Sequence, residues 1–159
     1  MKSPTVFVVD KNPVHRSLIS YNLIFNNFFN VYTFQSGSEC LYRLKKHFIP
    51  DFLITDYNPD DYNGIDFLCS VKEISPSIRI IFFAACDDPA TVLSLLDSGA
   101  ADYILKTGSP TAGISELIKN IKYLQREKSL SWNSGFNYDK NTPGYTVSPF
   151  IMLWNGHAD

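Results

Sequence analysis

The sequence lacks the features that indicate a membrane protein, a secreted protein or a nucleic-acid-binding protein. It contains no run of the roughly 18 apolar residues that a membrane span requires. Asp10 interrupts the apolar N-terminal stretch, so we expect no secretory signal peptide. The 14 lysine and arginine residues nearly balance the 16 aspartate and glutamate residues, which leaves a net charge of -2. Without an excess of positive charge, the chain is not expected to bind nucleic acid or an anionic membrane.

Cysteine is also scarce, with only Cys40, Cys69 and Cys86 among 159 residues. Their number is odd and their neighbours are apolar, which argues against a disulfide framework or a thiolate metal site. We therefore expect three buried, reduced thiols and a cytoplasmic location. The sequence also lacks a glycine-rich phosphate-binding loop, a flavin fingerprint and a nucleophile–base triad, so we do not expect an enzyme.

What is present is an alternation of short apolar runs with helix-like segments, in a chain that is 45% hydrophobic. Runs of β-branched and aromatic residues indicate buried strands. They are expected at residues 5–9, 29–34, 52–55, 78–83 and 102–105. The first helix is marked by apolar residues at helical spacing, namely Val14, Leu18, Tyr21 and Phe25. Pro13, Asp88-Pro89 and Ser109-Pro110 are typical helix starts, and Gly99 is a typical helix stop.

Five βα units with short connections require right-handed crossovers and helices on both faces of a parallel sheet. The pattern therefore predicts an α/β protein with a doubly wound sheet, a class that binds ligands at the carboxyl ends of its strands. Asp10 and Lys11 follow the first expected strand, Asp56 the third and Lys106 the fifth, while Ala84 ends the fourth. We expect these positions to converge on one pocket.

Four motifs in register resemble the receiver domain of two-component response regulators. They are VFVVDKNP (6–13), LITDYNPDDYNGIDFL (53–68), IIFFAACDD (80–88) and SGAADYILK (98–106). The resemblance implies a flavodoxin-like (βα)5 fold with strand order 2-1-3-4-5. It leads us to expect a receiver domain over residues 1–128.

By this resemblance, Asp56 is the aspartate that accepts a phosphoryl group from a histidine kinase. Asp10, Asp56 and the backbone carbonyl of Asn58 match the positions that hold Mg²⁺ in the family. Lys106 matches the lysine that pairs with the phosphoryl group, and Tyr103 matches an aromatic switch residue.

Three positions depart from the family pattern. Lys11 replaces a second acidic residue, Ala84 replaces a serine or threonine, and Thr107 replaces a proline. Counting Asp10 and Asp56 against two lysines, the pocket has a net charge of zero where the family has -2. We expect weak or absent Mg²⁺ binding and no other cofactor. We expect Lys11 to pair with Asp10 or Asp56, the alternative being a solvated lysine.

The remaining titratable residues near the strand ends are expected to play no part in the pocket. His15 is expected at the surface of the first helix. The loop aspartates are expected to be solvated turn formers rather than a cation site; they are Asp60, Asp61, Asp87 and Asp88.

Residues 129–159 break the βα pattern. Six aromatic residues occur there: Trp132, Phe136, Tyr138, Tyr145, Phe150 and Trp154. A disordered linker would be more polar and less aromatic. We expect a short ordered C-terminal appendage, either with a strand over Phe150–Trp154 or docked on the receiver or a partner, the alternative being an irregular C-terminus.

The sequence favours an atypical receiver domain, or pseudo-receiver, in phosphorelay signal transduction that acts by protein–protein interaction. Its expected partners are a histidine kinase or phosphotransfer protein, a downstream protein, and a second copy of the chain. One alternative is a working receiver that is phosphorylated on Asp56. An alternative of another class is a cofactor-binding flavodoxin-like protein. The sequence argues against it, because it has no loop that could bind the phosphate of a cofactor.

Overall fold

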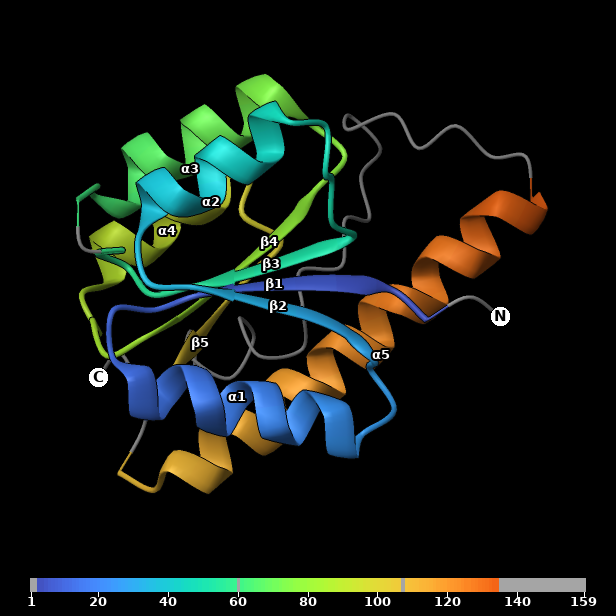
Figure 1. Ribbon diagram of the computed structural model, residues 1–159, viewed down its shortest axis with the longest axis horizontal. Coiled ribbons are helices and arrows are strands. Elements are labelled where there is room, and N and C mark those ends of the chain that lie inside the picture. The colour runs from blue at the N-terminus through green and yellow to red at the C-terminus, as the bar shows by residue number, and fades with distance from the viewer. Residues whose placement is uncertain (1–2, 60, 107, 135–159) are drawn as a thin grey trace, which may run out of the picture. The chain divides into compact units, whose positions relative to one another are not determined.

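The computed structural model describes residues 3–59, 61–106 and 108–134 (Figure 1). The chain divides into two compact units, Met1–Lys122 and Tyr123–Asp159, and the fold described below is that of the first. The expected domain boundary at residue 128 stays a prediction. The expected strand at Phe150–Trp154 lies outside the described residues.

Strands and helices alternate along the first unit, as the sequence predicts. The strands are β1 (Thr5–Val9), β2 (Asn30–Phe34), β3 (Phe52–Thr55), β4 (Arg79–Ala84) and β5 (Asp102–Leu105). The helices are α1 (Pro13–Phe25), α2 (Gly37–Lys45), α3 (Gly64–Ile74), α4 (Pro89–Asp97) and α5 (Pro110–Ser134). Because α5 continues to Ser134, residues 129–134 are helical and do not begin an irregular appendage.

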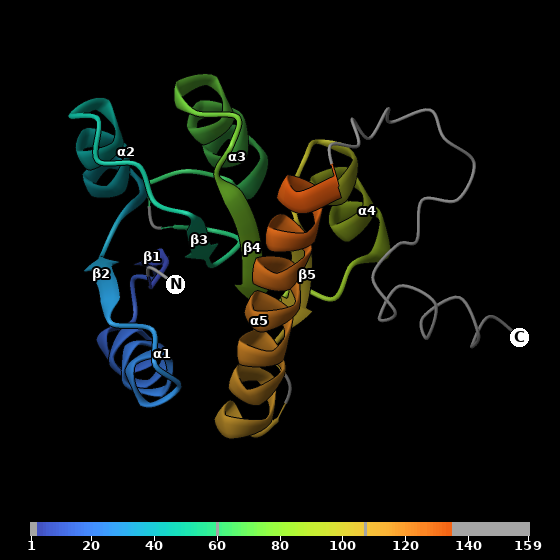
Figure 2. The same ribbon diagram turned by 90° about the vertical axis from the view of Figure 1, so that its right-hand side faces the viewer.

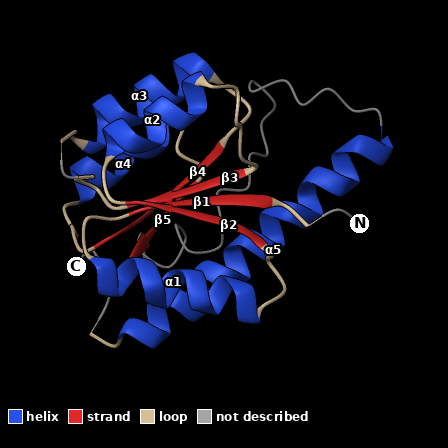
Figure 3. Ribbon diagram, viewed as in Figure 1, coloured by secondary structure: helices blue, strands red, loops and turns tan. Residues whose placement is uncertain are grey.

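The strands form one sheet in the order β2-β1-β3-β4-β5 (Figure 3), and every neighbouring pair is parallel. The predicted fold class and strand order are confirmed. Helices α2, α3 and α4 cover one face of the sheet, and α1 lies on the other with the first part of α5 (Figures 1 and 2). Side chains on both faces are buried, since Val6, Phe7 and Val8 are at most 1% exposed. This arrangement explains why the strands are continuous apolar runs.

Local signals begin and end the helices where the sequence predicts. Pro13 is the first residue of α1, and the Asn12 side chain accepts a hydrogen bond from the Val14 N–H at 2.9 Å. The Asp88 side chain caps α4 in the same way, and Gly99 follows that helix with a φ of 106°. A positive φ favours glycine, because a Cβ would clash there with the backbone. These helix starts and stops reverse the direction of the chain between each strand and the next helix. The connections from strand to helix therefore lie at one edge of the sheet.

The helical spacing does not show which side of α1 faces the sheet, and the expectation of three buried cysteines is wrong. The apolar residues that mark α1 lie on its outer side, and Val14, Tyr21 and Phe25 are 69%, 66% and 75% exposed. The sheet-facing side of α1 is instead formed by Ile19 and Leu23. The three cysteines do not share one environment either; they are Cys40, which is buried, Cys86, which is half-buried, and Cys69, which is exposed. Among the described residues, no helix is both long and apolar enough to span a bilayer.

Candidate functional site at the carboxyl edge of the sheet

The predicted convergence of charged residues at the strand ends occurs. Asp10 follows β1, Asp56 follows β3 and Lys106 follows β5. The Lys106 Nζ lies 2.9 Å from Asp10 Oδ2 and 2.8 Å from Asp56 Oδ2, so one ammonium group bridges the two carboxylates. The three residues are separated by 46 and 50 positions in the sequence, and the parallel sheet brings them to one edge.

The two carboxylates differ in access to solvent. The Asp10 side chain is 3% exposed and the Asp56 side chain is 27% exposed. Each uses its second oxygen to accept a backbone N–H: Asp10 Oδ1 from Asn12 at 2.8 Å, and Asp56 Oδ1 from Tyr57 at 2.6 Å. Asp10 is therefore buried, with both of its carboxylate oxygens hydrogen-bonded, whereas Asp56 remains accessible to solvent.

His15 belongs to this pocket, contrary to the expectation of a plain surface position. Its Nδ1 lies 3.4 Å from Asp10 Oδ2 and 3.5 Å from Lys106 Nζ, while its side chain remains 42% exposed. The first turn of α1 places it there, since the backbone N–H of His15 faces the Asn12 cap. A histidine three residues after the cap was the sequence signal for this contact.

Lys11 does not form the expected ion pair. Its side chain is exposed, and no salt bridge joins it to Asp10 or Asp56 in the described part of the chain. The backbone of this loop is instead held by Arg16, whose Nη1 donates to the carbonyls of Asp10 at 2.6 Å and Lys11 at 3.1 Å. This role of Arg16 could not be predicted from the sequence, because no motif distinguishes an arginine that binds backbone carbonyls.

The charge of the pocket changes accordingly. With Lys11 directed to solvent, the bridged group consists of two carboxylates and one ammonium, a formal charge of -1 rather than zero. The Lys106 chain also lies over the Phe83 ring, with Nζ 5.4 Å from the ring centroid, which fixes the ammonium from its apolar side.

The expected switch position is packed and hydrogen-bonded. The half-buried Tyr103 ring stacks on Phe82 with centroids 6.3 Å apart, and its hydroxyl donates to the Cys86 carbonyl in the β4–α4 loop. Burial raises the pKa of Tyr103 above its ordinary value, so the hydroxyl stays protonated and remains a donor. Ala84, at the end of β4, is fully buried and offers only a methyl group to the pocket.

The other expected site residues lie in loops beyond the strands or outside the described residues. Asn58 is exposed beyond β3, and the role expected for its backbone carbonyl stays a prediction. Asp61 accepts hydrogen bonds from the backbone N–H groups of Gly37 and Ser38, and Asp88 caps α4, so both act in loop structure. The expected positions that the structure does not describe are Asp60 and Thr107.

Mg²⁺ is a poor match for this donor set. The ion requires oxygen ligands in near-ideal octahedral geometry and is usually held by carboxylates. Asp10 and Asp56 supply two carboxylates, but the oxygens that face each other already bind the Lys106 ammonium. No group of three or more histidine, cysteine, aspartate or glutamate side chains in the described ranges is arranged to hold a metal ion.

A five-stranded parallel sheet with this order, whose strand ends join two aspartates and a lysine, defines a flavodoxin-like protein with an acidic strand-end pocket. Residues 6–120 match the family model of the response regulator receiver domain, so the chain belongs to that family.

Similarity to curated and solved proteins agrees with this family. The chain is 33% identical over 109 residues to the two-component response regulator ORR8 of Oryza sativa subsp. indica, across 67% of this chain and 88% of that protein. It is 29% identical over 101 residues to the chemotaxis protein CheY of Bacillus subtilis (strain 168), across 64% and 83% respectively. The receiver domain of the Francisella response regulator 1452 has the same fold, with a TM-score of 0.69 at 23% identity over 79% of this chain and 98% of that chain.

Proposed function

We propose that this receiver domain works in two-component signalling as an atypical member, with impaired metal-dependent phosphorylation and output through protein–protein contact. Receiver domains in general connect histidine kinases or phosphotransfer proteins to downstream proteins, and they are signalling domains rather than enzymes. The observation that carries the proposal is Lys11, an exposed lysine directly after the buried Asp10, at a position where receivers of the usual pattern have an acidic residue.

The substitution at position 11 supports impaired metal binding. A receiver of the usual pattern has an acidic residue there, and Lys11 replaces that oxygen ligand with a positive charge next to Asp10. Lys11 lies in the loop between β1 and α1, directly after Asp10, so its positive charge opposes a cation that binds at Asp10. Two unit charges interact by about 1 kcal/mol at 4 Å in water and by about four times as much near a protein surface. The repulsion of a divalent ion is larger still.

The region around Ala84 and Tyr103 supports an altered output. A phosphoryl group adds charge and acceptor oxygens, and the usual switch requires a mobile hydroxyl that follows them. Ala84 has no hydroxyl, and the Tyr103 hydroxyl is already bonded to the Cys86 carbonyl. The orientation of Tyr103 is therefore set by packing and by a backbone acceptor, which a binding partner can alter without phosphate.

The second candidate function is a working receiver that is phosphorylated on Asp56. It is favoured by the accessibility of the Asp56 carboxylate, which is 27% exposed, and by the 2.8 Å contact with Lys106, whose ammonium would offset the charge of the phosphoryl group.

Incubation of the protein with a small acyl phosphate, with and without millimolar Mg²⁺, distinguishes the two functions when it is followed by intact mass. We expect little gain of a phosphoryl group in either condition. Lys11→Asp should restore a third carboxylate and produce Mg²⁺-dependent phosphorylation, and adding Asp56→Asn to that variant should abolish it. Near-complete, Mg²⁺-dependent phosphorylation of the unmodified chain would instead establish the second function.

A further inference from the structure

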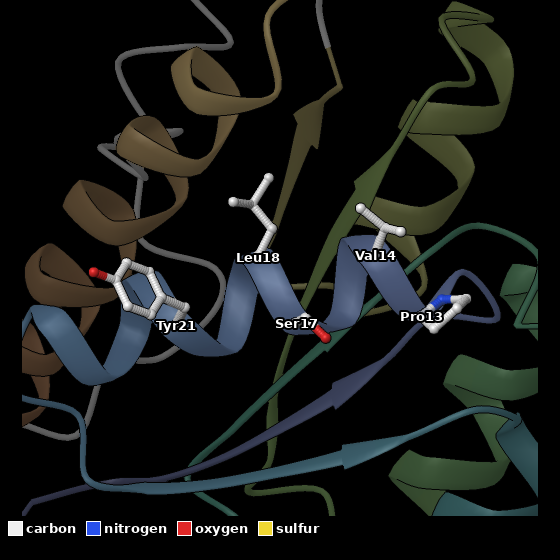
Figure 4. Close-up of a pocket in the computed structure, with 5 residues that line it drawn as sticks. All are labelled: Pro13, Val14, Ser17, Leu18 and Tyr21. Carbon is white, nitrogen blue, oxygen red and sulfur yellow. The ribbon is translucent and has the colours of Figure 1, made fainter.

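Helix α1 has two apolar faces, of which the sheet uses only one. Ile19 and Leu23 are buried against the sheet. On the other side lie Val14, Leu18, Tyr21 and Phe25, which we call the α1 stripe. Figure 4 shows Val14, Leu18 and Tyr21 projecting to one side of the helix, where they line a shallow open hollow together with Pro13 and Ser17.

Two more exposed apolar residues lie close by in the sequence. Ile24 is 48% exposed, and Phe29, just after the helix, is 66% exposed. Of the eleven exposed large hydrophobic residues in the described part of the chain, five lie between residues 14 and 29. Single exposed apolar residues are common, but a contiguous patch of several hundred Å² marks an interaction site.

The α1 stripe carries no charge. Pro13–Phe25 contains no acidic residue, and its only basic residues are His15 and Arg16. Both are engaged on the pocket side of the helix, His15 beside Asp10 and Arg16 with backbone carbonyls. Two copies of this surface can therefore face each other without opposing like charges.

The spacing of the stripe suits packing against another helix of the same kind. Positions 14, 18, 21 and 25 alternate intervals of four and three residues, as in the seam of a helix pair. The Tyr21 and Phe25 rings are stacked 6.3 Å apart, which gives a flat aromatic end to the seam.

The exposed area is also sufficient for a pair of chains. An aromatic side chain has about 150–250 Å² of surface, so the exposed fractions of Tyr21, Phe25 and Phe29 correspond to about 400 Å² of exposed area. Adding Val14 and Ile24 raises the exposed apolar area to about 600 Å². Complete burial of these five residues on two chains removes about 1,200 Å², the lower end of the range for specific interfaces. We propose that the α1 stripe, together with Ile24 and Phe29, is a homodimer interface, in which α1 of one chain packs against α1 of a second copy. This interface does not depend on phosphorylation of Asp56.

Sedimentation of the full chain over a series of concentrations tests the interface. We expect the mass to rise from 18.0 kDa toward twice that value with concentration. Phe25→Glu should keep the chain monomeric, because it places two carboxylates opposite each other in a symmetric contact. Leu93→Glu is the matched control, since Leu93 is 54% exposed on α4, and it should leave the dimer intact. Unchanged circular dichroism and melting temperature show that both variants fold.

A mixing experiment identifies the residue at the contact. Phe25→Glu and Phe25→Lys should each be monomeric alone but should form a heterodimer when mixed, and added salt should weaken it. A chain that stays monomeric at every concentration would overturn the proposal. So would a dimer that Leu93→Glu dissociates while Phe25→Glu does not.

Discussion

Replacement of Lys106 by methionine tests whether the bridging ammonium holds the pocket together. Methionine keeps an unbranched side chain but removes the ammonium, together with its contacts to both carboxylates and to the Phe83 ring. The substitution removes the ammonium that bridges the Asp10 carboxylate, which is 3% exposed, to Asp56, and leaves His15 as the neighbouring side chain of Asp10.

The magnitude follows from the two contacts of 2.9 and 2.8 Å and from the burial of the partners. Removing one partner of a fully buried ion pair costs about 3–5 kcal/mol. Because Asp56 is 27% exposed and Lys106 15%, water screens part of the loss. We expect Lys106→Met to lower the free energy of unfolding by about 2–4 kcal/mol at neutral pH.

Urea denaturation of Met1–Asp159, followed by circular dichroism, measures this loss. Lys122→Met is the control, because Lys122 bonds only to the neutral Asn26 side-chain amide in the described contacts, and its effect should stay within about 0.5 kcal/mol. Asp10→Asn added to Lys106→Met should recover part of the stability, because it removes the unpaired buried charge. A loss below about 1 kcal/mol for Lys106→Met, or no recovery in the double variant, would refute this account of the pocket.

Two further substitutions probe the elements around the site. Burial raises the pKa of Asp102 to about 6, so this carboxyl favours the folded state most below its unfolded pKa, and that contribution is lost as the pH rises through about 6. Asp102→Asn should therefore be more stable than the parent chain at pH 7, by about 2 kcal/mol, with the gain shrinking toward pH 4; equal pH profiles in thermal melts would contradict this. Gly64→Ala places a Cβ 2.7 Å from the Tyr57 ring and 2.8 Å from its backbone oxygen, so the loop after Asp56 must shift. We expect a loss of about 1–3 kcal/mol in urea denaturation together with changed amide resonances of Asp56, whereas an unperturbed loop would show that the contact is not required.

Much of the fold could be read from local patterns. The apolar runs predict the strands because a strand covered on both faces must be apolar along its length. Pro13 and Asp88 predict helix starts, and Gly99 a helix stop, because capping acts over only three or four residues. Once the elements alternate, the handedness of the crossovers directs each helix, and the strand ends come to one edge.

Sequence patterns predicted burial poorly where a helix has apolar residues on two sides. Helical spacing alone cannot say which side of α1 faces the sheet, because Ile19 and Leu23 form one apolar side and the α1 stripe forms another. The same ambiguity made Cys69 a candidate for burial, although it lies on the exposed side of α3.

The sequence by itself determined the alternation of elements, the parallel sheet and the residues that stand at the carboxyl ends of its strands. The tertiary structure decided which of them meet: Lys106 bridges Asp10 and Asp56, His15 joins them, and Lys11 turns to solvent. The physical reason is distance. Runs and caps act between neighbours in the chain, whereas an ion pair across the sheet depends on the path of each loop, on packing such as Lys106 over Phe83, and on competing donors such as Arg16.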